Sequence, residues 1–164
     1  MSKIDNFYSK KVLNHFKNPH NYGRLKNADG TGKAGNIICG DEMYFYIKVG
    51  DNQKKEKVIK DIKFEAFGCV AAISTSSVIT DLVKGKTLEE AMKINSNQVV
   101  KALGGLPSLK VHCSLLGIDA LSEAIYDYLS KNKMAIPQEL EKRHKRITET
   151  NEKIKARRKK LEKN

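Results

Sequence analysis

The sequence predicts a mixed α/β domain, of the α+β kind, followed by a C-terminal extension. Two stretches in the first half alternate apolar and polar residues as strands do, and most segments around them have the apolar spacing of helices. The chain has 164 residues, 40% of them apolar, which suffices for one hydrophobic core but not for two. We therefore expect one domain at residues 1–135 and a basic, helical or partly disordered tail at residues 136–164.

The first elements are a short amphipathic helix and a loop. Apolar residues recur at helical spacing over residues 7–16, and Asn18-Pro19 then ends the helix. Residues 21–35 contain four glycines with Asn and Asp between them. This composition predicts a loop that buries little.

A β-hairpin is expected next. Residues 43–49 and 62–66 have the period-two alternation of half-buried strands, and residues 50–57 form a polar turn between them. The hairpin supplies two antiparallel strands.

Helices fill the rest of the predicted domain. A stretch without Pro or Gly begins at Cys69 and ends at Gly85, and Thr87 with Glu90 makes a capping box. The expected helices cover residues 70–84, 87–94, 96–103 and 113–131.

Composition narrows the class of protein. No apolar run approaches the roughly 20 residues of a membrane span, and the first residues do not form a signal peptide. The chain has three cysteines, far apart in sequence, which cannot all pair within the chain. We therefore expect a cytoplasmic protein without a membrane partner, whose cysteines bind metal or perform thiol chemistry.

The positive charge is concentrated at the C-terminus. Residues 137–164 hold 11 Lys and Arg against 5 Asp and Glu, which is half of the formal net charge of +12. Such charge could attract nucleic acid, but the chain carries no recognised nucleic-acid-binding motif. We rank a nucleic-acid partner well below a metal-centred function.

The three cysteines are expected to converge. Cys39 and Cys69 lie at equal distances in sequence from the hairpin turn, so antiparallel pairing brings them to the same end of the sheet. Cys69 and Cys113 each begin a helix, where free amide groups and the helix dipole favour anions and lower thiol pKa values. One thiolate-rich pocket results.

Residue types alone leave alternatives open. Each cysteine by itself could be a small buried apolar residue, Asp41 could be a turn-forming residue, and His112 could be a surface histidine. Taken together, Cys39, Cys69 and Cys113 favour a metal or sulfur site, with Asp41 as an oxygen ligand or His112 as a nitrogen ligand. Such a set suits Zn²⁺ or an iron–sulfur cluster, and ligand softness does not choose between them.

Several ordered motifs lie within residues 8–131. They are Tyr8-Ser9-Lys10-Lys11-Val12, Asn18-Pro19, Cys39-Gly40-Asp41, Phe67-Gly68-Cys69, Lys84-Gly85-Lys86-Thr87-Leu88-Glu89-Glu90-Ala91 and Lys110-Val111-His112-Cys113-Ser114. Together they resemble the IscU/NifU-type iron–sulfur scaffold family.

The resemblance implies a SufE/NifU-like fold with a three-stranded antiparallel sheet flanked by helices. It further implies that Cys39, Cys69 and Cys113 accept sulfur and bind the iron of a [2Fe–2S] cluster, with Asp41 and His112 as further ligand candidates, and that zinc can occupy the same site. The implied function is cluster assembly and transfer by a scaffold that is not an enzyme. The implied partners are a cysteine desulfurase, an electron donor such as a ferredoxin, and apo-protein acceptors.

The sequence departs from the family in the segment before His112. Members that use a dedicated Hsp70-type chaperone carry Leu-Pro-Pro-Val-Lys, where this chain reads Leu106-Pro107-Ser108-Leu109-Lys110. Leu106, Pro107 and Lys110 remain partner-binding candidates, but the change puts an Hsp70-type contact in doubt. The alternative function is that of the related SufU branch, a zinc-dependent sulfur acceptor for a cysteine desulfurase.

The C-terminal tail carries half of a coiled-coil seam. Leu140, Ile147, Ile154 and Leu161 recur every seven residues, but the companion heptad positions are polar. We expect a solvated, fraying helix in preference to a basic helix that docks on an acidic partner, because one apolar residue per two turns buries little.

Overall fold

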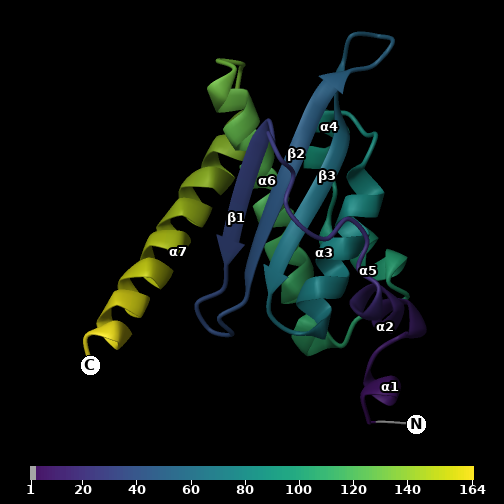
Figure 1. Ribbon diagram of the computed structural model, residues 1–164, viewed down its shortest axis with the longest axis vertical. Coiled ribbons are helices and arrows are strands. Elements are labelled where there is room, and N and C mark those ends of the chain that lie inside the picture. Colours follow the sequence, from purple (N-terminus) through teal and green to yellow (C-terminus); the bar gives the residue numbers. More distant parts are fainter. Residues whose placement is uncertain (1–2) are drawn as a thin grey trace.

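The computed structural model describes residues 3–164. It places a three-stranded antiparallel sheet, in the order β1-β2-β3, among helices (Figure 1). The elements are α1 (Lys3–Phe7), α2 (Lys10–Lys17), β1 (Gly30–Gly35), β2 (Glu42–Asp51), β3 (Lys57–Phe67), α3 (Val70–Val83), α4 (Leu88–Met92), α5 (Ser96–Ala102), the 3₁₀ turn η1 (Ser108–Lys110), α6 (His112–Lys131) and α7 (Gln138–Glu162).

The core lies between one face of the sheet and the helices α3 and α6. Helix α6 packs on β1 and β2, and α3 packs on β3 and on α6. Phe45 and Phe64, on neighbouring strands, are fully buried together with Ile79 of α3 and Ile125 of α6. This arrangement confirms the predicted fold class, including the helical C-terminal extension.

The predicted hairpin is confirmed. Strands β2 and β3 pair from Glu42 opposite Phe67 to Asp51 opposite Lys57, with one irregularity after Lys48. Because Glu42 and Phe67 pair, the residues just outside the hairpin, Asp41 and Gly68, are also neighbours.

The prediction of a loop over residues 21–35 is wrong at its end, where β1 lies. Gly30 and Gly32 face α6 so closely that an added Cβ would lie 2.2 Å from the carbonyl oxygens of Ala124 and Ala120, respectively. Glycine is therefore required for the strand to pack on the helix. A strand whose inward positions are glycines shows no apolar alternation, so its sequence looks like a loop.

The helix predicted from residue 7 begins later. Ser9 is the N-cap of α2, and its hydroxyl accepts a hydrogen bond from the Val12 amide. Residues 3–7 form the separate helix α1. The other predicted helices are confirmed within a few residues, and the Thr87–Glu90 capping box is present.

Helix α7 corrects the expectation of a solvated, fraying tail. Leu140 and Ile147 are only 4% and 2% exposed, because α7 packs along β1 and α6 (Figure 1). Leu161, at the far end of the same seam, is exposed. The first three turns of the helix are therefore joined to the core. No helix within residues 3–164 is long and apolar enough to cross a membrane.

Candidate metal centre

Asp41 and Cys69 meet at one end of the hairpin. Asp41 immediately precedes β2, and Cys69 is the N-cap of α3, two residues after the end of β3. The Cys69 Sγ lies 3.8 Å from the buried Asp41 Oδ2. Gly68 permits this contact, since a Cβ at that position would lie 2.7 Å from the Asp41 carboxyl group.

Cys113 completes a buried group with these two residues. It lies in the first turn of α6, and its side chain is inaccessible to solvent. Its Sγ lies 3.9 Å from the Cys69 Sγ and 3.9 Å from the Asp41 Oδ2. Two thiols and one carboxylate thus converge from two helix starts and a strand start.

Cys39 and His112 approach the same carboxyl group from the solvent side. Cys39 lies in the turn between β1 and β2, where Asn36 Oδ1 accepts its amide hydrogen, and it is exposed. One potential ligand atom each from Cys39, Asp41 and His112 lie within 4.8 Å of one another. The His112 Nε2 also lies 3.6 Å from the Cys113 Sγ.

The structure therefore brings all five candidate ligands together around Asp41. Asp41, Cys69 and Cys113 form one group of potential ligand atoms, and Cys39, Asp41 and His112 form the other. The donor set contains three sulfurs, one carboxylate and one imidazole. It can hold soft or borderline metal ions such as iron and zinc.

The two inner cysteines differ in acidity. A hydrogen bond from the Cys113 thiol, the Ala72 amide of the first turn of α3, and the Lys110 charge together lower the pKa of Cys69 to about 5, against the effects of burial and of Asp41. The same hydrogen bond and burial raise the pKa of Cys113. The hydrogen bond between the two sulfurs thus favours one thiolate in the pair, and the first turn of α3 and the Lys110 charge favour that thiolate at Cys69.

The predicted partner-binding residues lie between α5 and α6. Leu106 and Pro107 are half-buried, and Lys110 ends η1. The negative charge of Cys69 raises the pKa of Lys110. The ammonium group of Lys110 therefore lies close enough to the cysteine centre to interact with its charge.

Two features of this centre were missed from the sequence. Large apolar side chains beside the cysteines in sequence are exposed; they are Ile38, Phe67, Leu109 and Leu115. Tyr8 is also near the centre, since burial and then the charge of Cys69 raise its pKa. No sequence signal identifies such residues, because an apolar residue at the end of an element is ordinarily assigned to the core.

Known proteins resemble this chain over most of its length. A family model described as "NifU-like N terminal domain" matches residues 7–135. An Archaeoglobus fulgidus protein named "Iron-sulfur cluster assembly scaffold protein IscU 1" is 52% identical over 145 residues, which cover 84% of this chain and 92% of that protein. A Haemophilus influenzae protein named "Iron-sulfur cluster assembly scaffold protein IscU" is 49% identical over 127 residues, 76% and 97% of the two chains.

Solved structures share the fold. The crystal structure of the N-terminal part of a nitrogen-fixing NifU-like protein from Brucella abortus superposes with a TM-score of 0.59, covering 79% of this chain and 99% of that one. At 24% sequence identity, this likeness supports the fold alone. Together with the curated relatives, it confirms the resemblance predicted from the motifs.

Proposed function

Because this chain belongs to the NifU-like N-terminal domain family, we propose that it is a scaffold on which an iron–sulfur cluster is assembled and from which the cluster is transferred. The observation that carries the proposal is the convergence of Cys39, Cys69 and Cys113 around Asp41 at one end of the sheet. The curated relatives, whose sequences are 52% and 49% identical to this chain, are named as scaffold proteins for the same process.

The cargo in this proposal is a [2Fe–2S] cluster. Cys39, Cys69 and Cys113 supply three thiolates, and either Asp41 or His112 supplies the fourth ligand. An oxygen or nitrogen ligand binds iron less tightly than a fourth thiolate, which favours release to an acceptor. Zinc fits the same donor set and competes for it.

The proposed partners follow from the chemistry. A cysteine desulfurase delivers sulfane sulfur to a scaffold thiolate, and the Cys69 thiolate is the nucleophile available at neutral pH. Reduction of each sulfane sulfur to sulfide takes two electrons, which a donor such as a ferredoxin supplies. Apo-proteins then take the cluster. Leu106, Pro107 and Lys110, with the exposed apolar side chains near them, are candidates for partner contact.

The proposed role is that of a carrier rather than of an enzyme, because the cluster is built on the chain's own side chains and leaves intact. We assign this role to residues 1–135, working in the cytoplasm, where thiols stay reduced. The extent of the family match, residues 7–135, supports this division of the chain.

Anaerobic reconstitution tests the proposal. The metal-free chain is incubated with ferrous iron, cysteine, a cysteine desulfurase and a reductant such as dithiothreitol, and the product is examined by absorption and Mössbauer spectroscopy. We expect a [2Fe–2S] spectrum and transfer of the cluster to an apo-ferredoxin. A chain that instead keeps one zinc ion, forms no cluster and accelerates sulfur release by the desulfurase would be a sulfur acceptor of the SufU kind.

A further inference from the structure

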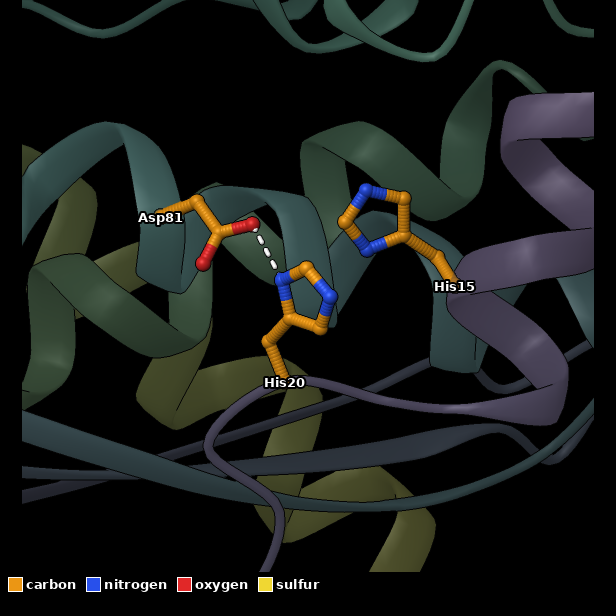
Figure 2. A group of neighbouring side chains, drawn as sticks. All are labelled: His15, His20 and Asp81. Atoms are coloured by element: carbon orange, nitrogen blue, oxygen red, sulfur yellow. Dashed lines mark hydrogen bonds and ion pairs between the residues drawn. The ribbon is translucent and has the colours of Figure 1, made fainter.

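A second cluster of metal-binding side chains lies where α2 and the turn after it pack on α3. It consists of His15, His20 and Asp81 (Figure 2). One ligand atom of each residue lies within 4.8 Å of those of the other two. The His20 Nδ1 and Asp81 Oδ2 are 2.6 Å apart, and the two imidazole centroids are 4.6 Å apart.

This cluster is separate from the cysteine centre. Cys69 precedes the first turn of α3, whereas Asp81 lies in its last turn. Twelve residues of α-helix span about 18 Å along the axis, so one ion cannot contact both residues. Within residues 3–164, the two other groups of potential metal ligands both contain Asp41.

A single buried hydroxyl group positions both histidines. Ser77 of α3 is fully buried, and its Oγ accepts a hydrogen bond from the His20 amide at 2.8 Å. The same Oγ lies 2.8 Å from the His15 Nδ1. The hydroxyl group thus anchors the His15 ring and the His20 backbone on α3, in the way that outer hydrogen bonds orient metal-binding histidines.

The cluster is accessible to solvent. The side chains of His20 and Asp81 are 46% and 39% exposed, so an ion can enter from solvent. His15 is half-buried beside them, on the side of the cluster that packs on α3.

We propose that His15, His20 and Asp81 bind a divalent transition metal ion, with Zn²⁺ the best suited. Two imidazole nitrogens and one carboxylate oxygen match the ligand types of zinc, whereas Ca²⁺ and Mg²⁺ take oxygen ligands. Ligand atoms around tetrahedral zinc lie about 3.3 Å apart. The His20–Asp81 pair at 2.6 Å therefore has to open and any wider separation, none above 4.8 Å, has to close, which the exposed side chains of His20 and Asp81 permit.

The bound ion would join three segments of the chain. His15 belongs to α2, His20 to the turn after it and Asp81 to α3. In the metal-free state, the short contact between His20 and Asp81 and the packing of α2 hold these segments together. Zinc binding at this cluster should therefore raise the melting temperature, because it stabilises only the folded chain.

Calorimetric titration with ZnCl₂ tests this proposal in a Cys39→Ser/Cys69→Ser/Cys113→Ser background, which lacks the thiolates of the first centre. We expect one zinc ion per chain. Adding His20→Asn or Asp81→Asn should raise the dissociation constant for zinc at least tenfold. The matched controls His144→Asn and Asp61→Asn should leave it unchanged, since these residues lie outside both the cluster and the cysteine centre.

Imidazole ¹H–¹⁵N spectra of the wild-type chain provide a second measurement that does not depend on how the background variant folds. With zinc in excess of the cysteine centre, one ring nitrogen each of His15 and His20 should shift to a metal-bound position. Unchanged spectra for both rings, or a dissociation constant insensitive to His20→Asn and Asp81→Asn, would overturn the proposal. The three side chains would then form an ion pair and a helix-packing contact only. Neither measurement involves cluster assembly, so a negative result for zinc binding leaves the proposed scaffold function unaffected.

Discussion

Arg158 of α7 pairs with Glu42 at the start of β2, with 2.7 Å between the guanidinium Nη2 and the carboxylate Oε1. The neighbouring Arg157 donates from its Nη1 to the Ile37 carbonyl oxygen, 3.1 Å away. Glu42 follows Asp41, and Ile37 lies in the turn that carries Cys39. The C-terminal helix therefore contacts both sides of the segment that holds two candidate ligands.

Removal of α7 should affect stability more than cluster binding. A chain that ends at Ala135 loses the buried Leu140 and Ile147 side chains, whose burial contributes roughly 3 to 5 kcal/mol at most. We expect a lower melting temperature and faster hydrogen exchange over residues 36–40, but the wild-type number of irons and sulfides per chain. Failure of a folded truncated chain to form a cluster from free iron and sulfide would make α7 part of the centre.

Serine at Cys39, Cys69 or Cys113 should in each case prevent formation of a stable cluster. The effects on stability should differ, because Cys39 is exposed and Cys113 is fully buried. A buried hydroxyl group costs about 1 to 2 kcal/mol, so Cys113→Ser should melt earlier, while Cys39→Ser should melt like the wild type. Circular dichroism measures the melting temperature of each variant, and iron analysis measures how much cluster it forms. A variant that forms as much cluster as the wild type would remove its residue from the ligand set.

Alkylation of the metal-free protein should depend on pH in a residue-specific way. The pKa of Cys69 is lowered to about 5, so it is a thiolate, and reactive, at every pH above that value. The pKa of Cys113 is raised, so this residue should stay unmodified at neutral pH. Mass spectrometry after short iodoacetamide pulses between pH 4 and pH 9 measures both. An inflection for Cys69 near pH 9, its ordinary value, would contradict the hydrogen-bonded pair.

Alanine at Asp41 should give a longer-lived cluster. Its buried carboxylate lies at the centre of the ligand groups, and its loss removes a labile oxygen contact. We expect transfer to an apo-ferredoxin to slow several-fold. Asp51→Ala, at the opposite end of the hairpin, is the matched control and should transfer at the wild-type rate. Unchanged or faster transfer from the Asp41 variant would argue against its role in release.

Alanine at Gly32 should strongly destabilise the fold. The added Cβ would lie 2.2 Å from backbone atoms of Ala120 and Ala124, which cannot move without displacing α6 from the sheet. We expect a loss of about 3 kcal/mol or more in urea unfolding, within the range of severe packing changes. Thr31→Ala, on the exposed side of the same strand, should cost less than about 1 kcal/mol. Equal stability of the two variants would contradict the close packing of β1 on α6.

The sequence by itself determined the hairpin, most helix boundaries and the convergence of the cysteines. These features follow from local signals: alternation in residues 43–49 and 62–66, the cap formed by Thr87 and Glu90, and the position of Cys69 at the junction of strand and helix. Antiparallel pairing then brings Cys39, Asp41 and Cys69 together without further information, because a hairpin joins its two ends.

Only the tertiary structure decided the roles of β1 and α7 and the meeting of His15, His20 and Asp81. Gly30 and Gly32 have no side chains to reveal a strand, and their small size matters only against α6. Leu140 and Ile147 are too sparse to order a helix alone, but β1 and α6 supply the surface that buries them. Contacts between elements distant in sequence create each of these features, as they bring Asp81 to His20 across 61 positions.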